Sequence, residues 1–214
     1  FAIFKKEAAF YKKRGGNVFW VGHPMIDLIT KLPLKKDART ILNLRPDQNI
    51  ILLMPASRPQ ELRYILPTFM RAAKKLQQKY PSLVVYIPSC RDTFDEIFKK
   101  AFRKYQVKGL VISQKDSAKL KPYIYSLTKI ALCKSGTVNM ELALYGIPQI
   151  VGYRVSRVTA FIAKKILNFK VRFISPVNLL VNKLIIPEFV QREFDEKKIF
   201  YKSCRILEGK SEKI

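Results

Sequence analysis

Residues 49–58 of the chain read Asn-Ile-Ile-Leu-Leu-Met-Pro-Ala-Ser-Arg, and this stretch decides the fold class. The first six residues, Asn49–Met54, form a continuous apolar run of strand length. Such a run is typical of a parallel strand that is covered on both faces. A helix is predicted after Arg58, with a kink or local irregularity at Pro67. The apolar residues of this helix recur at helical spacing: Leu62, Ile65, Leu66, Phe69, Ala73 and Leu76.

Short apolar runs alternate with helical segments on both sides of this stretch. Strands are predicted at residues 17–21, 83–87, 110–112, 130–133 and 149–153, and helices at 92–105, 117–127 and 138–145. In the helix at 92–105, one apolar face is predicted to consist of Phe94, Ile97, Phe98 and Phe102. The basic, proline-containing segment 31–48 is interpreted as a loop or linker. This alternation predicts an α/β fold: a Rossmann-like parallel sheet with right-handed crossovers and helices on both faces.

The composition excludes several classes of protein. Hydrophobic residues make up 48% of the 214 residues and aromatic residues 12%, which excludes a disordered chain. No apolar run reaches the length of about 18 residues that a membrane-spanning helix needs. Three cysteines, Cys90, Cys133 and Cys204, lie far apart in the sequence, so neither a disulfide scaffold nor a cysteine zinc site is expected. With His23 as the single histidine, no metal site is expected.

The net charge is unusual: 41 Lys and Arg against 16 Asp and Glu give +25. It predicts attraction to an anionic partner, which leaves nucleic acid, phospholipid headgroups and a phosphorylated small molecule as alternatives. Biased codon composition and solvated lysine faces are the competing explanation for much of the excess. No recognition motif for nucleic acid and no interleaved base-stacking aromatics are present, so specific nucleic-acid binding is not expected.

Two loops that follow predicted strands carry the candidate chemistry, since ligands of open parallel sheets bind beyond the carboxyl ends of the strands. In Pro55-Ala56-Ser57-Arg58, small residues allow close approach of a ligand and Arg58 offers donors to phosphate oxygens. An ordinary turn with a surface arginine is the competing interpretation. Lys134-Ser135-Gly136-Thr137 combines a lysine, two hydroxyls and a glycine at the start of a helix, where N–H groups favour an anion.

Glu141 follows Thr137 by one helical turn, so both side chains can face the same way. Its carboxylate is a candidate acceptor for a ribose diol, while the N–H groups of the preceding loop hold a pyrophosphate. Helix capping and compensation of the helix dipole form the competing interpretation.

Four blocks of sequence resemble the carboxyl-terminal half of the lipid-A-disaccharide synthase family, glycosyltransferases of the GT-B architecture. They read GHPMID from Gly22, LLMPASRPQEL from Leu52, KSGTVNMELALYGIPQIVGYRVS from Lys134, and SPVNLL with IPEFVQ ending at Gln191. The blocks keep the family's order and spacing. Pro-Ala-Ser-Arg, together with Lys134 before Ser-Gly-Thr, is similar to cyanobacterial and plant-type members.

The resemblance implies that the chain binds the UDP-sugar donor. Such enzymes transfer 2,3-diacylglucosamine from its UDP ester to 2,3-diacylglucosamine 1-phosphate, releasing UDP and using neither metal nor cofactor. Arg58, Glu141 and Asn178 match family residues that are important for activity, and we take these three as catalytic. The residues expected to bind UDP are Ser57, Arg58, Lys134, Ser135, Gly136, Thr137, Glu141 and Tyr153.

The resemblance also implies the domain organisation. Residues 1–30 form an interlobe segment whose hinge is Gly22-His23-Pro24, and residues 31–214 form the donor-binding lobe with carboxyl-terminal helices. The amino-terminal acceptor lobe, where the general base is expected, is absent from this chain. We therefore interpret the sequence as a fragment that binds donor weakly and catalyses little.

Residues 153–172 predict a basic amphipathic helix. Val158, Phe161, Ile162 and Ile166 form its apolar stripe, and Arg154, Arg157, Lys164, Lys165, Lys170 and Arg172 supply the charge. The helix either lies in an anionic membrane interface or packs its stripe into the core. The expected location is peripheral, at the cytoplasmic face of the bacterial inner membrane, or in a plastid or mitochondrion for a plant or algal member. A homodimer is left open.

Three other functions compete with this one. Another GT-B UDP-hexosamine transferase or a UDP-sugar epimerase would share the fold. A basic nucleic-acid-binding module would account for the charge. A degenerate lobe that is retained as a scaffold would not require Arg58, Glu141 and Asn178.

Overall fold

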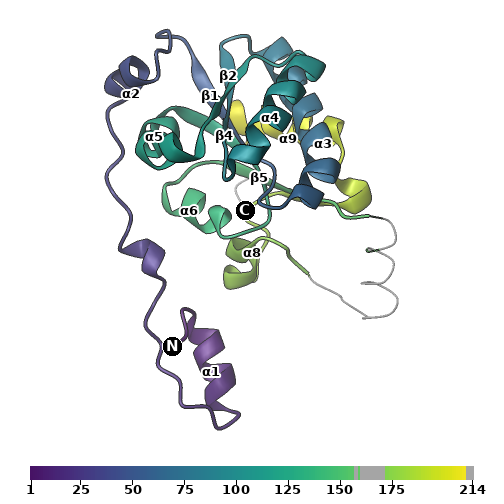
Figure 1. The fold of residues 1–214 in the computed structure, drawn as a ribbon. Helices are drawn as coiled ribbons and strands as arrows, with labels where there is room; N and C mark the ends of the chain where they lie inside the picture. The colour runs from purple at the N-terminus through teal and green to yellow at the C-terminus, as the bar shows by residue number, and fades with distance from the viewer. Residues whose placement is uncertain (157–158, 160–171, 211–214) are drawn as a thin grey trace. The chain divides into compact units, whose positions relative to one another are not determined.

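A computed structural model describes residues 1–156, 159 and 172–210 of the chain. Two compact units are present, Phe1–Lys31 and Leu32–Ile214. The larger unit contains the sheet and the helices that cover it (Figure 1). Much of the predicted amphipathic helix, including Val158, Phe161, Ile162, Ile166 and most of its basic residues, lies outside the described residues.

All the pairings in the larger unit's sheet are parallel. The strands are β1 (Asn49–Met54), β2 (Leu83–Pro88), β3 (Gly109–Ile112), β4 (Thr128–Lys134), β5 (Gln149–Tyr153) and β6 (Glu188–Val190). Among the described residues their spatial order is β3-β2-β1-β4-β5-β6, with β1 paired to both β2 and β4. This is the order of a doubly wound Rossmann fold, in which the direction of winding reverses between β1 and β4. The predicted fold class is therefore confirmed.

Helices cover both faces of the sheet because alternate residues of β1 point to opposite sides. Ile51 and Leu53 are buried with the helices of one side, and Ile50 and Leu52 are buried in a separate cluster on the other. The first side carries α3 (Pro59–Lys79), α4 (Asp92–Tyr105) and α9 (Glu196–Leu207). The second carries α2 (Lys35–Ile41), α5 (Gln114–Leu127) and α6 (Val138–Leu144), as Figure 1 shows for α5 and α6. Burial on both faces explains why the strand sequences are continuously apolar.

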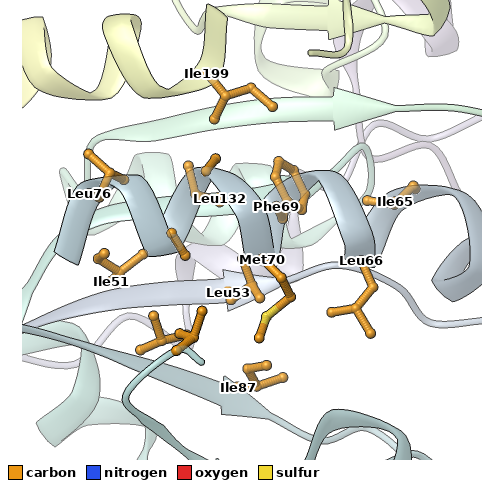
Figure 2. Packing of buried hydrophobic residues seen from close by; sticks show 14 of the residues in the cluster. Ile51, Leu53, Ile65, Leu66, Phe69, Met70, Leu76, Ile87, Leu132 and Ile199 are labelled. Carbon is orange, nitrogen blue, oxygen red and sulfur yellow. The ribbon is translucent and has the colours of Figure 1, made fainter. Parts of the chain in front are cut away.

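Helix α3 is the centre of the first face. Its predicted apolar residues are all buried, and Figure 2 shows Phe69, Met70 and Leu76 lying against strand residues such as Ile51 and Leu53. The helix begins with Pro59, whose fixed φ suits the first helical position, and it continues unbroken through Pro67. In α4, Phe94 and Phe98 are buried as predicted, but Ile97 is 42% exposed.

Four features differ from the sequence-based expectation. The predicted strand at 17–21 is wrong: within this part of the described chain only Trp20 pairs, in an isolated bridge to Ala2, so no ladder forms. The predicted loop at 31–48 contains α2, whose one buried residue, Ala38, leaves no apolar periodicity in the sequence. The three-residue strand β6 and the short helix α8 (Pro176–Val181) were not predicted individually.

The smaller unit consists of α1 (Lys5–Lys12), the Ala2–Trp20 bridge and a 3₁₀ turn at Pro24–Ile26. Gly22 has φ +83°, a left-handed conformation that glycine adopts at little cost. The Nδ1 atom of His23 accepts a hydrogen bond from the N–H of Met25 at 3.1 Å and so caps the turn. His23 therefore has a local structural task, and its role as a hinge stays a prediction.

Candidate nucleotide site at the carboxyl ends of β1 and β4

The two loops that the sequence singles out meet where the winding of the sheet reverses. Met54 at the end of β1 is paired in register with Cys133 near the end of β4. The loop after β1 supplies Ser57, and the loop after β4 begins with Lys134. Lys134 Nζ donates a hydrogen bond to Ser57 Oγ at 2.8 Å, which joins the loops directly. This edge of an open parallel sheet is the position at which such folds bind ligands.

Glu61 completes this junction, and sequence reasoning did not single it out. Its Oε1 atom lies 2.8 Å from Lys134 Nζ, and both side chains are largely buried. Its Oε2 atom accepts the backbone N–H groups of Ser57 at 2.9 Å and Arg58 at 3.1 Å. Partial burial raises the pKa of Glu61, but the hydrogen bonds from Lys134, Ser57 and Arg58 outweigh it, so its pKa lies below the ordinary value. A glutamate at the third position of a helix is the capping signal that would have identified it.

Arg58 and Ser57 are exposed at the start of α3. No carboxylate of the described residues forms an ion pair with the Arg58 guanidinium. The Arg58 backbone, in contrast, is fixed by Glu61. The loop therefore holds a rigid main chain beneath a guanidinium whose donors face solvent, as an anion ligand requires.

The loop after β4 is fixed from beneath by Asn139, which is fully buried in α6. The Asn139 Oδ1 atom accepts the Gly136 N–H at 2.9 Å, and its Nδ2 atom donates to the carbonyl of Lys134 and to Gln149 Oε1, both at 3.2 Å. The Gly136 N–H is therefore already engaged, contrary to the expectation that it faces a pyrophosphate. The N–H groups of Thr137 and Val138 have no intrahelical acceptor and remain the main-chain donors of this turn.

The hydroxyl of Ser135 is engaged within the fold. The Oγ atom donates a short hydrogen bond to the carbonyl of Ile174, in the segment that leads into α8. Because this hydroxyl is engaged, the UDP contact predicted for Ser135 would have to come from its main chain. The side chain connects the loop after β4 to Ile174, 39 positions further along the sequence.

Glu141 lies on α6 with its side chain 20% exposed, and its Oε1 atom pairs with Lys121 Nζ of α5 at 2.6 Å. Burial, followed by the nearby charge of Glu141, raises the pKa of Tyr125, so this tyrosine stays protonated. The ammonium group of Lys121 therefore lies beside the Glu141 carboxylate. Glu141 lies one helical turn after Thr137, the residue that precedes α6, and ribose binding stays a prediction.

Asn178 lies in α8 and is fully buried. Its Oδ1 atom accepts the N–H groups of Ile185 and Ile186, each at 2.9 Å. Its Nδ2 atom donates to the carbonyl of Ile186 and to Glu188 Oε1, each at 2.7 Å. All four hydrogen-bonding positions of the amide are therefore occupied by the protein. A direct catalytic contact, as predicted for Asn178, would require this network to open.

The end of β5 is occupied by structural contacts. The ring of Tyr153 packs against the core cluster on the α3 side of the sheet. The Arg154 guanidinium donates to the carbonyls of Gln191 and Phe194, so its donors are engaged within the fold. A Cβ at Gly152 would lie 2.1 Å from the ring of Phe194, which explains the glycine at this position.

Among the described residues there is neither a cluster of metal ligands nor a helix that could span a membrane. No group of three or more His, Cys, Asp and Glu side chains is arranged to hold a metal ion. None of the described helices has both the length and the apolar character needed to cross a bilayer.

Similarity to known proteins extends over the whole chain. A family model described as lipid-A-disaccharide synthetase matches residues 1–214. A lipid-A-disaccharide synthase of Prochlorococcus marinus (strain MIT 9313) is 46% identical over 99% of this chain and 54% of its own length. That of Gloeothece citriformis is 38% identical over 96% of this chain and 52% of the relative. The chain thus spans about half the length of the curated relatives it matches.

Solved structures show the same fold at low identity. Escherichia coli ADP-heptose LPS heptosyltransferase II aligns with a TM-score of 0.56 at 9% identity, covering 82% of this chain and 51% of that one. WaaG, a glycosyltransferase involved in lipopolysaccharide biosynthesis, aligns with a TM-score of 0.58 at 10% identity, over 83% and 43%. These likenesses concern the fold, that of one lobe of a GT-B glycosyltransferase.

Proposed function

The chain belongs to the lipid-A-disaccharide synthase family, and from that premise we propose that it supplies the donor-binding half of a glycosyltransferase. The donor is UDP-2,3-diacylglucosamine, the acceptor is 2,3-diacylglucosamine 1-phosphate, and UDP is released. The observation that carries the proposal is the Lys134–Ser57 junction at the reversal point of the sheet, where two candidate phosphate loops meet.

The charges at this junction suit a departing UDP. Negative charge develops on the diphosphate as the glycosidic bond breaks, and fixed donors stabilise it without reorganising. Arg58 and Lys134 supply cations from the two loops, and the N–H groups of Thr137 and Val138 lie at the start of α6. The ion pair with Glu61 holds Lys134 in place before the donor arrives. The general base belongs to the other half of the proposed enzyme.

The proposed location is peripheral, at the cytoplasmic face of a bacterial inner membrane, with a plastid or mitochondrion as the alternative. Support comes from the lipid character of the proposed substrates and from the charge of +25, which favours an anionic surface. The contact surface is not assigned to Arg154, since that guanidinium is held by carbonyl groups of Gln191 and Phe194.

Competition among nucleotides tests this function against its alternatives. The chain is titrated with UDP, ADP, UDP-N-acetylglucosamine and UDP-2,3-diacylglucosamine, and binding is followed by the shift in melting temperature. The proposal predicts preference for UDP over ADP and the largest shift with the acylated donor. Equal shifts with acylated and unacylated sugars would favour another UDP-hexosamine transferase or an epimerase.

A further inference from the structure

Glu188 is a carboxylate at the start of β6 that neither the sequence analysis nor the proposed function uses. Its two oxygens receive three hydrogen bonds, all from one short stretch of chain. Oε2 accepts the N–H of Ile174 at 2.8 Å, and Oε1 accepts the N–H of Ser175 at 2.8 Å and Asn178 Nδ2 at 2.7 Å. No positive side chain among the described residues pairs with Glu188, so its charge is balanced by N–H donors.

Asn178 holds the other end of the same stretch. It binds the backbone of Ile185 and Ile186, just before β6, and donates to Glu188. Asn178 and Glu188 thus close a loop of the chain on itself, from Ile174 to Glu188. The amide serves as both donor and acceptor, and the carboxylate serves as acceptor for all three of its partners.

A hydrogen bond to one backbone atom of this closed loop, the carbonyl oxygen of Ile174, connects it to the candidate nucleotide site. The carbonyl of Ile174, whose N–H is held by Glu188, accepts the hydroxyl of Ser135. From there the contacts continue to Gly136 and Asn139 on the other side of the loop. The loop after β4 is therefore fixed from two sides, by Asn139 beneath it and by the Glu188–Asn178 pair through Ile174.

We propose that Glu188 and Asn178 are positioning residues, which act together through Ile174 and Ser135 to hold the loop of residues 134–137 in the shape that binds the nucleotide diphosphate. The inference rests on the proposed function, because it gives these residues a part in nucleotide binding. It gives a fully buried asparagine with no free hydrogen-bonding position a part in nucleotide binding without contact with the substrate.

The test compares the UDP dissociation constants of the wild type, Glu188→Gln, Ser135→Ala and the double variant, with Glu96→Gln on α4 as a matched surface control. In Glu188→Gln the new amide has one acceptor oxygen for three donors, so the link to Ile174 is weakened while the volume is kept. We expect Glu188→Gln to weaken UDP binding about tenfold, which corresponds to about 1.4 kcal/mol. The double variant should bind UDP no more weakly than Ser135→Ala, because the shared link is already cut.

Exchange of the two partners provides a rescue. In Asn178→Asp alone, two carboxylates face each other across the former hydrogen bond. Adding Glu188→Gln restores a donor–acceptor pair of reversed polarity. We expect the combined variant to bind UDP more tightly than Asn178→Asp alone at a temperature where both variants are fully folded, which a role for each residue in folding only does not predict.

Amide hydrogen exchange measures how firmly the loop of residues 134–137 is held in the absence of UDP. Glu188→Gln should accelerate exchange at residues 134–139 and leave β2 unchanged. Unchanged exchange there, an unchanged dissociation constant, or additive effects with Ser135→Ala would overturn the inference. A wild type that binds no UDP, with exchange still accelerated in the variant, would overturn the proposed function and the nucleotide part of this inference, but not the link from Glu188 to the loop.

Discussion

Lys134 Nζ lies 2.8 Å from Glu61 Oε1, so an ion pair joins the end of β4 to the first turn of α3. The two residues are 73 positions apart in the sequence. The same carboxylate holds the backbone of Ser57 and Arg58, so one glutamate organises the loop after β1 and the lysine at the end of β4. This arrangement underlies the proposed site.

Glu61→Gln is expected to flatten the acid dependence of stability. Because the pKa of Glu61 is lowered in the folded protein, its carboxylate stabilises the fold above the ordinary glutamate value of about 4.3. This contribution is lost as the pH falls through the lowered pKa. Melting temperatures between pH 7 and pH 3 should fall more for the wild type than for the variant. The exposed Glu7→Gln control should follow the wild type, and parallel curves for Glu61→Gln would contradict the ion pair.

Glu141→Ala is expected to abolish the stabilisation of the chain by UDP. Removing a charged acceptor of the ribose costs about 1.5–3 kcal/mol of binding. The control is Glu96→Ala on α4, another glutamate that pairs with a lysine, Lys99. Differential scanning fluorimetry should show a UDP shift for the control and none for Glu141→Ala. An undiminished shift for Glu141→Ala would show that Glu141 pairs with Lys121 but does not bind the ribose.

Gly152→Ala is expected to destabilise the fold. The added Cβ would lie 2.1 Å from the Phe194 ring, and overpacking of this kind costs about 1–3 kcal/mol. Gly136→Ala is the control for stability, because the nearest atom to its added Cβ is Lys134 Cε at 3.8 Å. Urea unfolding should separate the two variants, and equal midpoints would show that Phe194 moves aside freely.

Cys90 offers a reporter beside the site. It is exposed, whereas Cys133 and Cys204 are buried, and burial raises the pKa of Cys133 to about 12. The Sγ atom of Cys90 lies 3.7 Å from the carbonyl oxygen of Ala56, next to Ser57. We expect one fast-reacting thiol in the native chain, and slower alkylation when UDP is bound. Cys90→Ser should remove the fast phase; an unchanged rate with saturating UDP would place the nucleotide away from this loop.

The sequence predicts the sheet well because its strands are buried on both faces. The run Asn49–Met54 matches β1 residue for residue, and the spacing of Leu62 to Leu76 predicts the buried face of α3. The segment 17–21 has a similar apolar composition but no neighbouring strand among the described residues, so composition alone misleads there. A single buried alanine gives no periodicity, which is why α2 is missed.

The sequence predicts only part of the candidate site. The loops at residues 55–58 and 134–137 are recognised because each directly follows a buried strand. Glu61, Asn139 and Glu188 act through partners that lie elsewhere in the fold, such as Lys134 for Glu61 and Ile174 for Glu188. The complete burial of Asn178 and its four partners are tertiary properties that the sequence does not show, and its catalytic role stays a prediction.

Isothermal titration of UDP into the folded, monodisperse chain tests whether the junction of Lys134 and Ser57 binds the donor nucleotide. We expect a saturable isotherm with one UDP per chain, weaker binding of ADP, and a lower affinity when Lys134 is replaced by methionine. Absence of UDP binding by such a sample, or equal binding of UDP and ADP that is unaffected by Lys134→Met, would contradict the claim that the junction of Lys134 and Ser57 is a donor-nucleotide site.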